Sequence, residues 1–183
     1  MKKAYKDIHS NLIEACKRGE RKAQSEIYKL YARAMYNTAF RILNDRMEAE
    51  DITQESFLKA FQKLNYFSGD VSFGAWLKKI VVNASLDALR KRKFEFENIE
   101  DINTTKFEQT DYEENNQEYE LKKLRDAITK LPDGYRIVLS LYLLEGYDHD
   151  EIAEITGISS STSRSQLARA KKKLLEILTL NKK

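Results

Sequence analysis

Apolar residues recur along this chain at the three- and four-residue spacing of amphipathic α-helices. The pattern stops at glycines, at Asn44-Asp45 and near Pro132, the one proline, and it resumes after each interruption. The predicted fold class is therefore all-α. The expected helices cover approximately residues 8–17, 20–43, 45–64, 72–93, 118–131, 132–146, 148–156 and 159–175.

Two of the longer predicted helices show which side they should bury. In residues 20–43 the side expected to be buried is a stripe of Ile27, Tyr31, Ala34 and Thr38, widened by Leu30, Met35 and Ile42. In residues 72–93 it consists of Trp76, Ile80 and Leu86, with Val82 and Leu89 beside them. Because these positions share one side of a helix, we expect both stripes to be buried.

Helical periodicity fails between residues 94 and 117, and the charge changes there as well. From Phe94 to Glu120 ten acidic residues stand against one basic residue, Lys106, a net charge of −9 that leaves +12 for the rest of a chain whose total is +3. The sequence thus predicts an N-terminal helical domain (1–93), an acidic flexible linker (94–117) and a C-terminal helical domain (118–183). Two basic flanks suggest binding to a polyanion, although a solvated surface explains either flank alone equally well.

Residues 148–175 have the layout of a helix-turn-helix that ends in a basic helix. Asp148 can cap the first helix, and Glu151, three residues on, can complete a capping box. Gly157 can adopt the left-handed conformation that the turn needs, and Ser159 can cap the second helix. The turn is therefore specified by its residue types.

The second helix of this motif should present a polar, cationic side. Its buried stripe is expected at Ser163, Leu167, Ala170 and Leu174. Short hydroxyl and basic side chains, which suit base edges and phosphates in a DNA major groove, occupy the other side: Ser161, Thr162, Arg164, Ser165, Arg169 and Lys172. The alternative is a plain helical hairpin whose lysine-rich last helix is merely solvated.

The predicted helix at residues 45–64 has an apolar and a polar side. Asp45 and Glu48 can form a second capping box at its start. The apolar side carries Ala49, Ile52, Ser56, Ala60 and Leu64, with Phe57 and Phe61 beside them. The polar side carries Glu50, Asp51, Gln54, Glu55 and Lys59. Because these acids lie on one helix and are followed by a lysine, we interpret the polar side as a docking surface rather than a catalytic carboxylate site.

A glycine-containing loop at residues 65–71 carries two adjacent aromatics, Tyr66 and Phe67, and precedes a helix that ends in four basic residues. Asn83, Asp87 and Arg90 lie on successive turns of that helix and can face one way. Exposed aromatics beside a basic helix form the kind of platform on which single-stranded bases stack. The alternative is that the loop aromatics and Trp76 belong to the core.

Several function classes find no support in the sequence. His9 and His149 are far apart, no glycine-rich phosphate loop is present, and Cys16 is the single cysteine. We therefore expect no enzyme activity, no metal and no cofactor. The N-terminus is charged without a following apolar run, and no run is long enough for a bilayer, so we expect no membrane insertion and a cytoplasmic location.

Three segments in this order resemble the extracytoplasmic-function sigma factors, the small two-domain specificity subunits of bacterial RNA polymerase. EAEDITQESFLKAF (48–61) is similar to the family's polymerase-binding segment. SFGAWLKKIVVNASLDALRKRK (72–93) is similar to the helix that reads the minus-ten element, and LPDGYRIVLSLYLLEGYDHDEIAEITGIS (131–159) to the domain that reads the minus-thirty-five element. Each motif alone is moderately specific, and their combination with an acidic linker is highly specific.

The resemblance implies roles for individual residues. Those on or beside the surface that docks on core RNA polymerase are Asp45, Glu50, Asp51, Gln54 and Phe57. Those that contact the minus-ten element, where the 65–71 loop captures a flipped base, are Tyr66, Phe67, Trp76, Asn83, Asp87 and Arg90. Those that contact the minus-thirty-five element are Ser161, Thr162, Arg164, Ser165 and Arg169. An anti-sigma factor is a further partner that the resemblance suggests.

Three positions depart from the family pattern. Ser163 stands where a valine is usual, which weakens hydrophobic anchoring of the recognition helix, and Gln166 replaces a commonly basic residue. Gly74 replaces a longer polar residue in the first turn of its helix.

Two functions remain open on the sequence. The first is a sigma factor that binds core polymerase, recognises two promoter elements and helps to open the strands. The second is a free-standing regulator that binds operator DNA through its C-terminal domain alone. The polar side of residues 48–61 favours the first, because a free regulator has no reason to present it.

Overall fold

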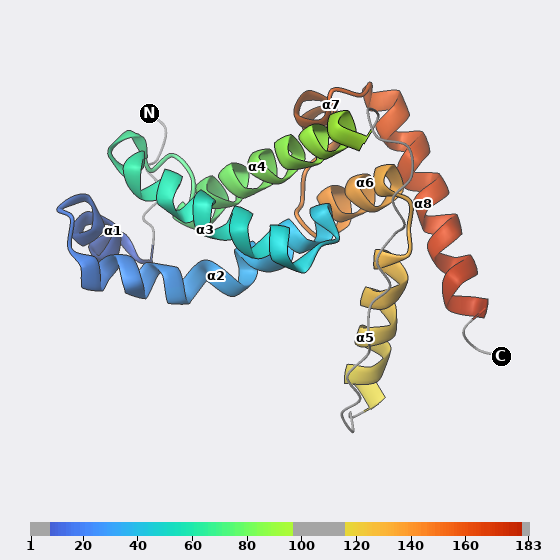
Figure 1. The fold of residues 1–183 in the computed structure, drawn as a ribbon, viewed down its shortest axis with the longest axis horizontal. Coiled ribbons are helices and arrows are strands. Elements are labelled where there is room, and N and C mark those ends of the chain that lie inside the picture. The colour runs from blue at the N-terminus through green and yellow to red at the C-terminus, as the bar shows by residue number, and fades with distance from the viewer. Residues whose placement is uncertain (1–7, 97–115, 181–183) are drawn as a thin grey trace. The chain divides into compact units, whose positions relative to one another are not determined.

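The computed structural model describes residues 8–96 and 116–180, with side chains for 8–92 and 119–180 (Figure 1). All regular structure within these ranges is helical, which confirms the predicted fold class. The chain divides into two compact units, Met1–Leu89 and Arg90–Lys183. Most of the predicted linker, residues 97–115, lies outside the described residues.

The first unit contains α1 (Ser10–Lys17), α2 (Arg21–Leu43), α3 (Arg46–Gln62), the 3-10 helix η1 (Leu64–Tyr66) and most of α4 (Phe73–Phe96). Local chemistry sets the boundary between α2 and α3. Asn44 ends α2 in the left-handed conformation at φ 55°, which a short polar side chain tolerates. Asp45 then caps α3 by accepting the amide N–H of Glu48 at 2.9 Å. The break expected at these two residues is confirmed.

Aromatic side chains from α2, the loop after η1 and α4 meet in the core of the first unit. Phe73 is buried, and its ring centroid lies 5.4 Å from that of Tyr31 and 5.8 Å from that of Phe67. At Gly74, an added Cβ would come within 2.9 Å of Cε1 of Tyr31. The missing side chain at Gly74 thus makes room for Tyr31, which is a packing reason for its departure from the family pattern.

The buried arcs of α2 and α4 agree with the predicted stripes only in part: Ile27, Met35, Thr38 and Ile42 of α2 and Val82 and Leu86 of α4 are buried as predicted. On α2, Leu30 is 52% exposed and Ala34 is also exposed, whereas Ala39 is fully buried. On α4 the buried row begins with Phe73 and continues through Leu77 and Val81, and Trp76 and Ile80 lie half-buried beside it. Both helices carry apolar residues on more than one side, so spacing alone permits neighbouring arcs. Packing decides between them, because α2 contacts both α1 and α3.

The second unit contains α5 (Asn116–Thr129), α6 (Asp133–Leu143), α7 (His149–Thr156) and α8 (Ser160–Leu180). Its core includes Leu139 and Leu141 of α6, Ile152 of α7, and Leu167 and Ala170 of α8. Helix α8 packs against α5, α6 and α7, so the orientation of α8 depends on all three.

A buried arginine fixes the start of α6. Arg136 is 2% exposed, and its Nη1 lies 2.8 Å from Oδ1 of Asp133 and donates to the carbonyl oxygen of Leu131 at 3.2 Å. Burial lowers the pKa of the Arg136 guanidinium, and the neighbouring Asp133 carboxylate opposes that effect. The ion pair thus satisfies a charge that the core would otherwise leave unpaired.

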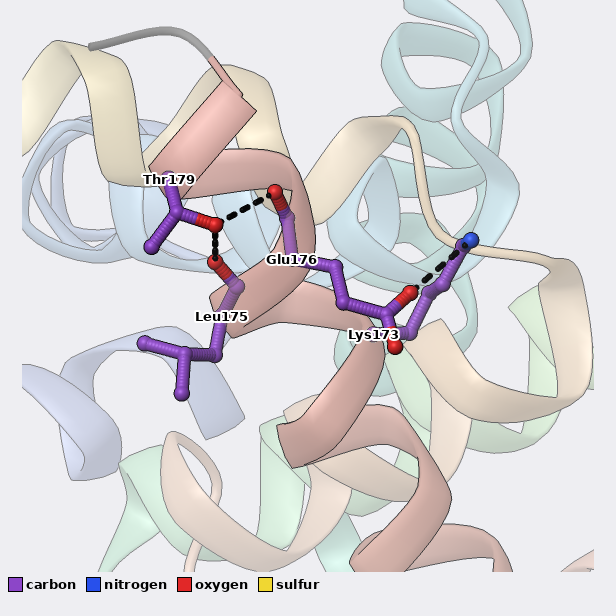
Figure 2. A network of polar contacts seen from close by, with 4 residues as sticks. All are labelled: Lys173, Leu175, Glu176 and Thr179. Carbon is purple, nitrogen blue, oxygen red and sulfur yellow. Dashed lines mark hydrogen bonds and ion pairs between the residues drawn. The ribbon is translucent and has the colours of Figure 1, made fainter.

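Helix α8 continues beyond residue 175, where its predicted pattern ended, to Leu180. Figure 2 shows the contacts that support this last part. Lys173 Nζ lies 3.2 Å from Oε2 of Glu176, and the Thr179 hydroxyl donates to the carbonyl oxygens of Leu175 and Glu176, each at 2.9 Å. Such i,i+3 ion pairs contribute about 0.2–0.5 kcal/mol to helix stability.

Candidate functional site

The turn of the helix-turn-helix has the geometry that its residue types predict. Asp148 accepts the amide N–H groups of Asp150 and Glu151 at 2.8 Å each, and the Glu151 carboxylate accepts the Asp148 amide at 2.9 Å. This reciprocal pair is a complete capping box. Gly157 ends α7 in the left-handed conformation at φ 78°. The capping box and the role of Gly157 are confirmed.

Hydroxyl groups organise the first turn of α8. Ser159 accepts the amide N–H of Thr162 at 3.1 Å, which confirms its role as the cap. The Ser159 hydroxyl also lies 2.9 Å from that of Ser161 and 2.8 Å from that of Thr162. The Ser165 hydroxyl donates to the carbonyl oxygen of Thr162 at 2.9 Å. These local bonds hold the hydroxyls in defined directions at the N-terminal end of the helix.

The two sides of α8 differ as predicted. Ser163, Leu167 and Ala170 are buried, and Leu174 is half-buried. The residues assigned to the minus-thirty-five element lie away from that stripe: Ser161, Arg164, Ser165 and Arg169 are exposed, and Thr162 is half-buried. Three consecutive lysines at residues 171–173 extend the exposed cationic surface toward the C-terminus. The arrangement can present base-reading groups at one end of the helix and phosphate-binding groups along its length.

Two polar contacts between α7 and α8 were not expected from the sequence. His149 Nδ1 lies 2.9 Å from Oγ of Ser163, and the Ser160 hydroxyl donates to the Asp150 carboxylate. The pattern marked His149 only as an isolated histidine, and spacing alone carries no sign of a contact across the turn. Only the packing of the two helices brings these side chains together.

The polar side of α3 forms an exposed row bounded by two apolar residues. Asp51 and Gln54 are exposed, and they share one side of the helix with Met47 and Leu58, because these residues follow one another at spacings of four, three and four. Met47 is 77% exposed and Leu58 is 62% exposed. We call Met47, Asp51, Gln54 and Leu58 the α3 row. Glu50 is exposed at its edge.

Phe57, placed on or beside the docking surface by resemblance, lies in the core, on the apolar side of the helix that its spacing predicted. It is 2% exposed, and its ring centroid lies 4.7 Å from that of Tyr28 and 6.1 Å from that of Phe61. It lies on the inner side of α3 and faces α2. Phe57 therefore packs in the core at the flank of the α3 row and offers almost no surface of its own. Asp45, from the same assignment, is half-buried as the cap of α3.

The loop aromatics divide between surface and core. Tyr66 is 84% exposed. Phe67 is half-buried and packs on Trp76, with ring centroids 5.2 Å apart, and Trp76 is half-buried as well. Of the three aromatic side chains, Tyr66 alone is exposed, whereas Phe67 and Trp76 are partly buried and pack against the core of the first unit.

The exposed side of α4 carries the three polar residues that the sequence placed together. Asn83, Asp87 and Arg90 are all exposed, at spacings of four and three along the helix. The Ser72 hydroxyl accepts the amide N–H of Ala75 at 3.2 Å and so caps the N-terminal end of α4. The cap fixes where α4 starts relative to the loop that holds Tyr66.

Within the described ranges, 8–96 and 116–180, no helix is long and apolar enough to cross a membrane. The same residues contain no cluster of histidine, cysteine and acidic side chains that could hold a metal ion.

Comparison with known proteins places these surfaces in a family. The Sigma-70 region 2 family matches residues 27–95, and the Sigma-70, region 4 family matches residues 121–174. The ECF RNA polymerase sigma factor SigW of Bacillus subtilis is 29% identical over 172 residues, which cover 88% of this chain and 92% of SigW. The ECF RNA polymerase sigma factor SigM of the same species is 31% identical over 150 residues, which cover 81% of this chain and 91% of SigM.

A solved structure shares the fold. The sigma factor RpoE of Bartonella quintana, crystallised with the anti-sigma factor NepR, matches with a TM-score of 0.61 at 24% sequence identity, over 85% of this chain and 96% of that chain. From the two family matches and the near full-length relatives, we conclude that the chain belongs to the extracytoplasmic-function (ECF) sigma factors, non-enzymatic subunits that direct RNA polymerase to promoters for transcription initiation.

Proposed function

We propose that the exposed side of α8 reads the minus-thirty-five element, with Ser161, Thr162, Arg164, Ser165 and Arg169 as base or phosphate contacts. The supporting observation is the division of α8 into a buried stripe and a polar, cationic side directly after a fully formed helix-turn-helix turn. A recognition helix of this kind enters the major groove with its N-terminal residues at the base edges.

The 65–71 loop and α4 engage the minus-ten element in this proposal. Tyr66 offers an exposed ring on which an unstacked base can lie, and Asn83, Asp87 and Arg90 line the exposed side of α4. Phe67 and Trp76 are half-buried and pack on each other. Flipping a base costs on the order of a few kcal/mol, and stacking on an aromatic side chain returns ~1–3 kcal/mol. The net free energy of flipping one base and stacking it on Tyr66 is therefore close to zero, so strand opening requires the polymerase.

The α3 row docks on core RNA polymerase, with Glu50 and Asp45 beside it and Phe57 in the core at its flank. Met47 and Leu58 are eleven residues apart, which is ~16 Å along a helix that rises ~1.5 Å per residue. The row therefore presents an acidic and amide centre between two apolar ends. A matching polymerase surface has basic or hydrogen-bond donor groups between two apolar patches.

The remaining assignments follow from family membership. The N-terminal domain at 1–93 binds polymerase and the minus-ten element, residues 94–117 are a linker, and the C-terminal domain at 118–183 binds the minus-thirty-five element. The protein works in the cytoplasm, where polymerase and promoters are. An anti-sigma factor is a further partner, because the related RpoE of Bartonella quintana was crystallised with one.

Site-specific photocrosslinking tests these three assignments together. A benzophenone amino acid is placed at position 58, 66 or 165 of the holoenzyme, with position 22 at the exposed start of α2 as the control. We expect position 58 to crosslink to a polymerase subunit, position 66 to single-stranded DNA of the downstream element, and position 165 to the upstream element. A crosslink from position 58 to DNA, or from 165 to polymerase alone, would contradict the corresponding assignment.

A further inference from the structure

His149 touches two other helices of the C-terminal unit. Its ring stacks on Tyr142 of α6, with centroids 4.5 Å apart and planes inclined by 20°. Its Nδ1 lies 2.9 Å from Oγ of Ser163 on α8. As the first residue of α7, His149 thus links α6, α7 and α8 at one point.

The partner of His149 lies inside the stripe that holds α8 in place. Ser163 is fully buried, on the same side of α8 as Leu167 and Ala170. A buried hydroxyl needs a hydrogen-bond partner, and His149 Nδ1 supplies one. Because a serine hydroxyl both donates and accepts, the contact fits either tautomer of the imidazole. The polar residue that replaces the family's usual valine therefore has a specific partner.

A second polar contact lies one turn away on α8. The Ser160 hydroxyl donates to the carboxylate of Asp150, the residue that follows His149. Ser160 and Ser163 are three residues apart and so lie on neighbouring turns of one side of α8. Apolar packing is non-directional, whereas hydrogen bonds depend on angle and distance. Two such bonds at neighbouring turns resist rotation of α8 about its own axis.

Rotation of α8 matters because its reading groups lie on the side away from this stripe. With side chains ~5–6 Å from the helix axis, a rotation of ~20° moves a group by ~2 Å, which exceeds the tolerance of a hydrogen bond. We propose that His149 is a positioning residue, which fixes the rotation of α8 through Ser163 and thereby sets how strongly the upstream element is discriminated. This inference rests on the proposed role of α8 as the reader of that element.

The test measures a specificity ratio in the holoenzyme. The ratio is the affinity for a promoter fragment selected by the wild-type holoenzyme, divided by the affinity for the same fragment with its upstream element replaced. His149→Phe keeps a ring for Tyr142 but removes Nδ1, and Ser163→Ala removes the hydroxyl. His149→Asn keeps a polar group near the Nδ1 position, and Glu154→Gln, at an exposed residue of α7, is the control.

We expect His149→Phe and Ser163→Ala each to lower the specificity ratio about tenfold, the equivalent of ~1.4 kcal/mol. Affinity for the replaced fragment, affinity for core polymerase and far-ultraviolet circular dichroism should stay at wild-type values. The specificity ratio of His149→Asn should stay close to the wild-type value, and that of Glu154→Gln should equal it. In the double variant His149→Phe/Ser163→Ala the ratio should fall no further than in the single variants, because both remove the same contact.

Three results would overturn the inference. The first is an unchanged ratio in both single variants, and the second is an additive loss in the double variant. The third is an equal loss of affinity for both fragments together with a lower melting temperature, which would make His149 a purely structural residue. A specificity ratio of one for the wild-type holoenzyme would instead contradict the proposed function of α8 itself. Because the wild-type protein is measured before any variant, this failure is distinguishable from a failure of the inference about His149.

Discussion

Phe57 and Leu58 are neighbours on α3 that differ in burial, and they allow fold and docking to be separated by single substitutions. Phe57 is 2% exposed and Leu58 is 62% exposed. Phe57→Ala should lower the free energy of unfolding of the first unit by ~3–5 kcal/mol, because it leaves a cavity between α2 and α3. Leu58→Ala should change it by less than ~0.5 kcal/mol but should weaken binding to core polymerase. Urea unfolding and a binding titration measure the two effects.

The opposite pattern would contradict this placement of the two residues. If Leu58→Ala destabilised the unit while Phe57→Ala left it stable, α3 would have to be rotated relative to its position in the structure. If Leu58→Ala left both quantities unchanged, Leu58 would not belong to the docking surface.

Asp51, at the centre of the α3 row, tests the docking surface by charge. Asp51→Arg should abolish binding to core polymerase, because it places a positive charge where the proposed docking surface presents an acidic group. Because Asp51 is exposed, the circular dichroism spectrum should stay unchanged. The matched control is Lys29→Glu, a charge reversal at an exposed residue of α2, which should bind normally. Normal affinity in Asp51→Arg would count against the assignment.

Substitutions at Arg164 and Lys171 should separate the proposed reading of bases from the proposed binding of phosphates on α8. Both are exposed, but Arg164 lies near the N-terminal end of the helix and Lys171 lies beyond its middle. Arg164→Ala should weaken binding to the cognate upstream element by ~1–3 kcal/mol and relax its specificity. Lys171→Ala should weaken binding to all sequences alike and lower the salt dependence. Unchanged specificity in Arg164→Ala would remove this residue from the base-reading set.

At the scale of elements, two glycines of the C-terminal unit should respond to alanine in opposite directions. Gly157 ends α7 at φ 78°, which a Cβ makes unfavourable, so Gly157→Ala should destabilise the unit by ~1 kcal/mol. Gly134 lies in the first turn of α6, where an added Cβ would lie 3.5 Å from Oε1 of Gln166, an ordinary contact. Gly134→Ala should therefore stabilise the unit by up to ~1 kcal/mol. Thermal unfolding measures the stability of both variants. An equal effect at the two sites would contradict the left-handed conformation assigned to Gly157.

The predictability of an element depended on whether local chemistry or packing decides it. Asn44, Asp148 and Gly157 mark helix ends through their own side chain or its absence, so the sequence predicted these boundaries. Leu30 shows the limit, because α2 carries apolar residues on more than one side and only the neighbouring helices determine which of them are buried. Phe57 lies on the apolar side that spacing predicted, and only the family resemblance had assigned it to the docking surface.

The same division applies to the candidate site. The polar side of α8 could be predicted, because a helix with one apolar stripe leaves its other side exposed. The contact between His149 and Ser163 could not, because it joins residues fourteen positions apart across a turn and depends on the angle between two helices. The fold of the segments was thus visible in the sequence, whereas the contacts that orient them were not.

At the scale of the whole molecule, the proposed function assigns different tasks to the two units. The first unit presents the α3 row and Tyr66, and the second presents the polar side of α8. A free-standing regulator would need only the second of these surfaces. The ECF family membership and the exposed α3 row agree in assigning this chain to a complex with polymerase.

The most direct test of this account measures promoter binding and strand opening with the protein alone, with core RNA polymerase alone and with both together. A pool of promoter fragments from the host is used, with permanganate reactivity of thymines reporting open strands. We predict that specific binding and opening occur only in the mixture, because stacking a base on Tyr66 only offsets the cost of flipping it and leaves no free energy to open DNA unaided. Discrete binding by the protein alone, with no response to polymerase, would contradict the account.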